Sequence, residues 1–156
     1  MSRKSQVSAG ILAYRLRPGL EVLLAHPGGP FWAKKDAGAW SIPKGLVESG
    51  DLLTCARREF TEETGLDADG AFIPLTPVKQ KSGKTVHAFA LAADFDLSRC
   101  RSNYFKAEWP PRSGKWKNFP EVDQVAYFDV ATARTKILPY QQPFLTELAH
   151  KLGLET

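Results

Sequence analysis

The chain has 156 residues, 43% apolar and 24% charged, which fits one globular domain and is too short for two of ordinary size. No apolar run approaches the roughly 20 residues that a membrane-spanning helix needs. The charged start, residues 1–6, lacks the apolar segment of a secretory signal, and Cys55 and Cys100 are too few for a disulfide framework. We therefore expect a single domain over residues 1–156, with reduced thiols, in the cytoplasm.

The net charge of +4 and the sequence pI of about 9.1 suggest an anionic partner. The basic residues are scattered along the sequence and never form a block of like charge. This distribution favours a small polyphosphate over a long nucleic-acid track, so a nucleic-acid partner is not expected. These scattered basic residues include Lys34, Lys35, Lys79, Lys81, Lys84, Arg112, Lys115 and Lys117.

The first half of the chain predicts strands followed by one helix. Short apolar runs at residues 7–15 and 20–25 flank turn residues and predict two strands. Residues 26–36 are rich in proline and glycine and predict a loop, and residues 40–42 begin another short strand. A helix is predicted from about residue 51 to residue 64, where a glycine follows in the position of a left-handed cap.

The second half predicts a hairpin, two more strands and a closing helix. Residues 78–80 and 85–93 flank a turn that contains glycine, and residues 105–109 and 124–128 are further strands. Residues 143–152 have the apolar spacing of an amphipathic helix. Strands on both sides of one central helix, with another helix at the end, predict an α+β domain with α/β/α layers.

Three carboxylates gather on one stripe of the predicted central helix. Each helical residue advances about 100°, so Glu59, Glu62 and Glu63 fall within about 100° of arc. Like charges at this spacing disfavour a helix, and anions in the last turn oppose the helix dipole. The neighbouring apolar stripe, which we expect to face the core, consists of Leu53, Ala56 and Phe60.

Two interpretations account for this crowding. The acidic residues could form a solvated face offset by Arg57 and Arg58. Alternatively they bind a hard divalent cation, because carboxylate oxygens are what magnesium prefers. Magnesium keeps several waters and meets its substrate through phosphate oxygens, so the second interpretation indicates phosphate chemistry.

Residues 45–66 resemble the Nudix box, usually written G-x5-E-x7-R-E-U-x-E-E-x-G-U, where U is a bulky aliphatic residue. The part from Arg58 to Leu66 matches this pattern, with the aromatic Phe60 at an aliphatic position. The front of the box departs from it. The spacing from Gly45 to the arginine is one residue short, and Asp51 stands where glutamate is expected.

The resemblance implies a mixed β-sheet between helices and a magnesium-dependent hydrolase of phosphoanhydride bonds, with manganese as a possible substitute. It assigns the metal to Glu59, Glu62, Glu63 and the carbonyl of Gly45. In the same scheme Arg58 holds a carboxylate in orientation through a charge-assisted pair. Glu62 thus belongs to both the metal-binding and the catalytic groups.

The general base varies in position among Nudix proteins, and Glu121 is our candidate, although it could also be a solvated turn residue. Lys44 in a Pro-Lys-Gly sequence, followed later by Lys84, resembles the dinucleoside polyphosphate hydrolases. The substrate expected from this resemblance is a compound such as diadenosine tetraphosphate. Trp32 is the candidate stacking platform for its base, since Trp40 lies in a predicted strand and is expected in the core.

Other functions remain open at this stage. A nucleoside triphosphate cleaved to a monophosphate and pyrophosphate is the second substrate class. The shortened box and the basic charge also fit a non-catalytic nucleotide- or RNA-binding module on the same fold. Asp51 is predicted to cap the central helix instead of binding metal, because it directly precedes the first helical residues.

Overall fold

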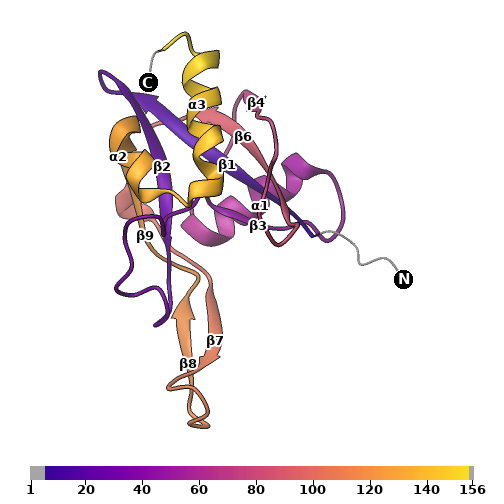
Figure 1. The fold of residues 1–156 in the computed structure, drawn as a ribbon, viewed down its shortest axis with the longest axis vertical. Coiled ribbons are helices and arrows are strands. Elements are labelled where there is room, and N and C mark those ends of the chain that lie inside the picture. Colours follow the sequence, from indigo (N-terminus) through magenta and orange to yellow (C-terminus); the bar gives the residue numbers. More distant parts are fainter. Residues whose placement is uncertain (1–5, 155–156) are drawn as a thin grey trace.

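A computed structural model describes residues 6–154 and shows a mixed sheet with helices on both faces (Figure 1). The expectation about a secretory signal depends on residues 1–6, and residues 1–5 lie outside the described part. The main sheet has seven strands, with β4-β6-β1-β2-β9 in spatial order. Its strands are β1 (Val7–Leu16), β2 (Leu20–Pro27), β3 (Lys44–Leu46), β4 (Phe72–Pro74), β5 (Val78–Lys79), β6 (Thr85–Ala92) and β9 (Val122–Asp129).

The central strand β1 determines the mixed character of the sheet. It pairs in parallel with the full length of β6, through Val7 to Tyr14, and in antiparallel fashion with β2 and β3. Seven of its residues in succession are buried, as expected for a strand covered on both faces. Because β3 pairs with the first half of β1, the chain after β3 emerges at the N-terminal end of β1, where the central helix begins.

Separate hydrophobic clusters lie on the two faces of the sheet. The helix α1 (Leu52–Thr64) covers one face, and its Ala56 and Phe60 are fully buried there. The helices α2 (Val130–Lys136) and α3 (Gln142–Lys151) pack on the other face. This arrangement confirms the predicted α/β/α layers. No helix in the described residues is both long and apolar enough to cross a membrane.

The two ends of α1 follow the sequence prediction. Asp51 is the N-cap, and its carboxylate accepts a hydrogen bond from the backbone N–H of Thr54 at 3.1 Å. Gly65 ends the helix at a φ of 75°, and its N–H donates to the carbonyl of Thr61. The capping prediction for Asp51 is confirmed.

The strand predicted at residues 40–42 is wrong. Ser41 and Trp40 make isolated bridges, to Ala25 and Ile137 respectively, and the strand itself begins at Lys44. The buried Gln141 of the 3-10 helix η2 (Pro139–Gln141) takes over part of the pairing, because its side-chain oxygen accepts from the Ile42 N–H at 3.1 Å. Side-chain pairing of this kind leaves no periodic signal in the sequence.

A two-stranded hairpin projects away from the main body (Figure 1). It consists of β7 (Tyr104–Glu108) and β8 (Trp116–Pro120), and we call it the arm, residues 104–120. The sequence predicted a strand at residues 105–109 but missed β8, since lysine, asparagine and proline interrupt its apolar residues. It also missed β4, α2 and the short 3-10 helix η1 (Leu97–Arg99).

Candidate active site

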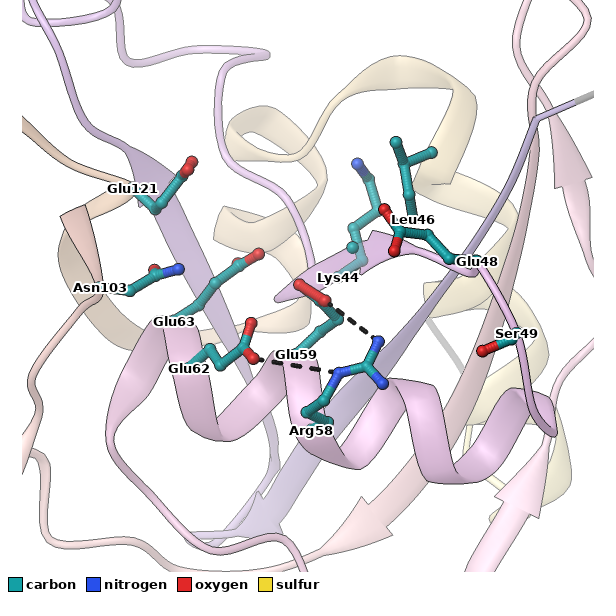
Figure 2. A pocket seen from close by; sticks show the side chains of 11 residues that line it. Lys44, Leu46, Glu48, Ser49, Arg58, Glu59, Glu62, Glu63, Asn103 and Glu121 are labelled. Carbon is teal, nitrogen blue, oxygen red and sulfur yellow. Dashed lines mark ion pairs between the residues drawn. The ribbon is translucent and has the colours of Figure 1, made fainter. Parts of the chain in front are cut away.

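A cavity of about 570 Å³ lies between the C-terminal half of α1, β3 and the base of the arm (Figure 2). Five glutamates and two basic residues line it, together with smaller contributions from the backbone. The carboxyl groups therefore outnumber the cations by five to two. The charged residues are Lys44, Glu48, Arg58, Glu59, Glu62, Glu63 and Glu121.

The acidic stripe predicted on α1 faces this cavity. Glu59, Glu62 and Glu63 all line it, and Figure 2 shows them projecting from consecutive turns of the helix. Arg58 lies beside them, with guanidinium nitrogens 3.6 Å from Glu59 Oε2 and 3.9 Å from Glu62 Oε1. The predicted pairing of Arg58 with a carboxylate is thus present, at ion-pair distances and not as short hydrogen bonds.

Gly45 brings the backbone of β3 against the Glu59 carboxylate. A Cβ atom at Gly45 would lie 2.0 Å from Glu59 Oε1 and 2.1 Å from its carboxyl carbon. Real Cβ atoms do not approach so closely, so any other residue at position 45 displaces Glu59. This geometry is consistent with the expectation that the Gly45 backbone lies beside the carboxylates of α1, even though the box is one residue short.

Burial dominates the electrostatics at Glu63 and Lys44. The pKa of Glu63 is raised to about 8, mainly by burial and also by the neighbouring Glu59 and Glu121, against the opposing effect of Lys44. Burial also lowers the pKa of Lys44, against the opposing effect of Glu63 and Glu59. Glu59 has a raised pKa because of burial and the nearby Glu62. A cluster of this kind is typical of a functional site.

Glu121 reaches the cavity from the chain segment between β8 and β9. Its backbone N–H donates to the Asn103 carbonyl at 2.8 Å, and its own carbonyl accepts from the Gly28 N–H at 2.9 Å. A Cβ at Gly28 would lie 1.9 Å from the Pro120 carbonyl oxygen, so glycine allows this close approach. Asn103 also donates its backbone N–H to the Glu62 carbonyl, which ties Glu121 to the end of α1.

Among the lining residues that the sequence analysis missed, two have carboxyl or amide side chains. Glu48 lies in the turn before α1, and Asn103 precedes the arm. For Glu48 a signal existed, because it belongs to the glycine-rich turn of the box. For Asn103 there was none, since its position depends on backbone hydrogen bonds between distant segments.

Trp32 and Lys84 are not among the described residues that line this cavity. Trp32 lies in the loop after β2, where its ring packs edge-on against Phe31 at 5.1 Å between centroids. Lys84 is exposed in the turn between β5 and β6, and its charge acts on Tyr140 on the other face of the sheet. Trp40 is buried in the core with 4% of its surface exposed, as expected.

The chemistry of the cavity fits a divalent cation that arrives with phosphate. Within residues 6–154, no group of three acidic, histidine or cysteine side chains is arranged to hold a metal ion by itself. Magnesium commonly binds through one or two carboxylates plus substrate phosphates and keeps several waters. The carboxylates of Glu59, Glu62 and Glu63 and the Gly45 backbone are hard oxygen donors suited to that mode.

A sheet between helices, with a carboxylate-lined cavity at the end of one helix, is consistent with binding a phosphate group through a divalent cation. The family described as NUDIX domain matches residues 4–148. The chain therefore belongs to the Nudix family, as its box indicated.

Two named relatives align with parts of the chain. Nudix hydrolase 7 of Arabidopsis thaliana is 30% identical over 100 residues, which cover 58% of this chain and 34% of the relative. The RNA pyrophosphohydrolase of Caulobacter vibrioides is 43% identical over 56 residues, 32% of this chain and 33% of the relative. The chain thus spans about a third of the length of each.

Solved structures confirm the fold. A binary complex of the Caenorhabditis elegans Ap4A hydrolase superposes with a TM-score of 0.67, covering 94% of this chain and 98% of that one. The identity between the two sequences is 20%, so the similarity establishes the Nudix fold and leaves the substrate to be tested.

Proposed function

We propose that the protein hydrolyses a phosphoanhydride bond in a nucleoside diphosphate linked to another group, with a dinucleoside polyphosphate such as diadenosine tetraphosphate as the preferred substrate. The proposal is supported by the composition of the cavity, in which five carboxyl groups face two cations. Such a cavity repels a bare polyphosphate, because like charges in a partly buried site interact strongly. Binding therefore requires divalent cations between the carboxylates and the phosphates.

The metal would be held by Glu59, Glu62, Glu63 and the Gly45 carbonyl, with magnesium the expected ion and manganese a substitute. When bound, the ion would neutralise the negative charge on the anhydride oxygens. Hydrolysis adds water to one phosphorus and breaks its bond to the bridging oxygen, so each product carries a terminal phosphate.

The remaining roles fall to other side chains around the cavity. Glu121 accepts the proton of the attacking water, as its place opposite the α1 carboxylates allows (Figure 2). Lys44 contacts the phosphate chain, since it lines the cavity and is one of its two basic residues. Arg58 keeps Glu59 and Glu62 in orientation.

Nucleoside binding is proposed outside the main cavity. An adjoining cavity of about 190 Å³ shares Lys44, Glu63 and Glu121 and adds apolar walls from Ile42 and Val122. Trp32, in the loop after β2, remains our proposed platform for a base, and Lys84 our proposed contact for a longer phosphate chain.

The test is product analysis with diadenosine tetraphosphate and ATP, each with magnesium, with manganese and with excess chelator. We expect hydrolysis only with a divalent ion, and a higher kcat/KM for diadenosine tetraphosphate. Equal efficiency on both substrates would favour the triphosphate class. Activity unaffected by chelator, or no hydrolysis of any polyphosphate, would refute the proposed function.

A further inference from the structure

The arm carries most of the surplus positive charge of the protein. Residues 104–120 contain four basic side chains against one acidic, Glu108, which gives a net charge of +3 out of the +4 of the whole chain. The sequence separates these charges by neutral residues, but the hairpin folds them onto one narrow projection (Figure 1). The basic residues are Lys106, Arg112, Lys115 and Lys117.

The two faces of the arm differ in character. Cross-strand pairing places Phe105 opposite Phe119, and their rings are 6.0 Å apart on the face that also contacts Gly29 of the main body. The opposite face carries Tyr104 and Trp116, which are 67% and 65% exposed. Large aromatic side chains exposed to this degree indicate a surface that meets a partner.

Lys106 lies between the two exposed aromatic residues on the same face. Trp116 pairs with Glu108, four residues beyond Tyr104 along β7, so the two aromatic positions are about 13 Å apart at the rise of an extended strand. One nucleobase cannot reach both positions. Two aromatic rings with a cation between them suit two bases of one strand that are separated by an intervening nucleotide, with the cation near the backbone phosphates; aromatic stacking combined with positive charge is how single-stranded nucleic acids are commonly bound.

The arm is held in shape by its own hydrogen bonds. The Glu108 carboxylate accepts from the backbone N–H groups of Arg112 and Gly114, both at 3.0 Å. The Ser113 hydroxyl accepts from the Lys115 N–H at 3.1 Å. Because these bonds order the tip, the exposed face is already formed before any partner binds.

The base of the arm is the rim of the cavity. Asn103 and Glu121, which directly flank the arm, both line it, and their backbones are joined by the hydrogen bond from Glu121. A chain lying along the arm toward Tyr104 therefore extends toward the rim of the cavity.

We propose that the arm face bearing Tyr104, Lys106 and Trp116 binds a single-stranded oligonucleotide. Such binding departs from the sequence expectation of no nucleic-acid partner, which was based on the scattered order of the charges. The binding itself requires no turnover and can be measured alone.

The test uses fluorescence anisotropy of a 3′-labelled hexanucleotide without a 5′ phosphate, in metal-free buffer of low ionic strength. We expect the wild-type protein to bind it, and Trp116→Ala to weaken binding about 5- to 100-fold, the usual effect of losing one base stack. Trp116→Phe keeps an aromatic ring and should restore most of the affinity. An unchanged affinity in Trp116→Ala overturns the proposal.

Two lysines provide a matched control. Lys106 and Lys117 occupy adjacent positions of the paired strands but point to opposite faces, so each substitution by alanine removes one charge at the same distance along the arm. We expect Lys106→Ala to weaken binding several-fold more than Lys117→Ala. Equal losses would show only the general attraction of a basic surface and would contradict a defined binding face.

Sedimentation and hydrolysis assays separate the other outcomes. If the wild-type protein is a dimer that Trp116→Ala dissociates, and the hexanucleotide does not bind, the face is an interface between two copies and the proposal is wrong. A protein that binds the hexanucleotide but hydrolyses no polyphosphate refutes the proposed function alone. One that hydrolyses diadenosine tetraphosphate but binds no hexanucleotide refutes the arm proposal alone.

Discussion

The two ends of α1 are built on opposite principles. At its start, Asp51 satisfies a free backbone N–H and complements the positive end of the dipole, and the hydrogen bond from Thr54 lowers the pKa of Asp51. The last turn lies within the described residues. It contains no basic side chain and carries Glu62 and Glu63 instead. The first turn of the helix therefore stabilises the folded protein, whereas the last turn destabilises it by bringing carboxylates together.

The acidic end is costly in three ways that stability alone does not explain. When ionised, Glu59 and Glu63 repel each other at i,i+4 spacing, the carboxylates of Glu62 and Glu63 in the last turn oppose the helix dipole, and burial disfavours the charged form of Glu63. Each cost falls when a cation binds between the carboxylates. The difference between the ends therefore locates the function at the end of α1, and the following substitutions test it.

Glu63→Gln should have the largest effect on activity. It keeps the shape of the side chain but removes a negative charge from the centre of the cavity, so we expect kcat to fall roughly several hundredfold or more. The matched control is Glu147→Gln on α3, outside the cavity, which should retain full turnover. Full activity of Glu63→Gln would remove the basis of the mechanism.

Glu121→Gln should rank second. If Glu121 removes the proton from the attacking water, its loss lowers kcat by about a hundredfold, near the lower end of the range for a general base. The loss should fall on kcat, with KM nearly unchanged, because Glu121 is proposed to act on the attacking water and not on the bound substrate. A lower melting temperature that accounts for the reduced rate would assign Glu121 a structural role at the cavity rim.

Lys84→Ala should change the choice of substrate by only a few-fold. Lys84 is exposed in the turn after β5, so any contact with phosphate is with the distal part of a long chain. We expect kcat/KM to decrease more for diadenosine tetraphosphate than for ATP, whereas Lys81→Ala in the same turn leaves the ratio unchanged. Identical ratios in both variants would exclude Lys84 from substrate binding.

Asp51→Ala should affect stability and leave chemistry almost intact. Loss of a helix cap lowers the melting temperature of a domain of this size by about 2–6 °C. At a temperature well below melting, kcat should change less than about threefold, because the carboxylates lie two turns further along α1. An unchanged melting temperature with a thousandfold lower kcat would place Asp51 in the metal site.

The sequence predicted α1 and its carboxylates well because both depend on local spacing. The cap at Asp51, the left-handed Gly65 and the stripe of glutamates all follow from helical geometry within about four turns. The sequence did not predict the contacts between distant segments. The bonds that hold Ser41 and Ile42 to Gln141, and Asn103 to Glu121, join residues that no local pattern connects.

The distribution of positive charge on the arm was likewise not predictable from local sequence patterns. Along the sequence its lysines are separated by neutral residues and look like an ordinary solvated surface. Antiparallel pairing of β7 with β8 brings them together and sorts the aromatic residues onto two faces. Which face each residue occupies depends on the register of the hairpin, and β8 itself gave no clear strand signal.

The raised pKa of Glu63 also makes stability depend on pH. In metal-free buffer the folded protein keeps a proton on Glu63 up to about pH 8, whereas the unfolded chain releases it near 4.5. Between these values the folded state binds more protons, so the contribution of Glu63 lowers the free energy of unfolding as pH rises. Glu63→Gln should lack this decline and should melt higher than wild type above pH 8, with the difference vanishing near pH 4.5.

The melting temperature of wild type and Glu63→Gln at pH 8.5, measured in chelator and then with increasing magnesium, tests the central claim most directly. The account predicts that wild type melts lower than the variant in chelator and gains more from magnesium, because only its folded state offers the full set of carboxylates. An equal magnesium-induced shift in the two proteins, or none in wild type, would contradict a cation site at the end of α1.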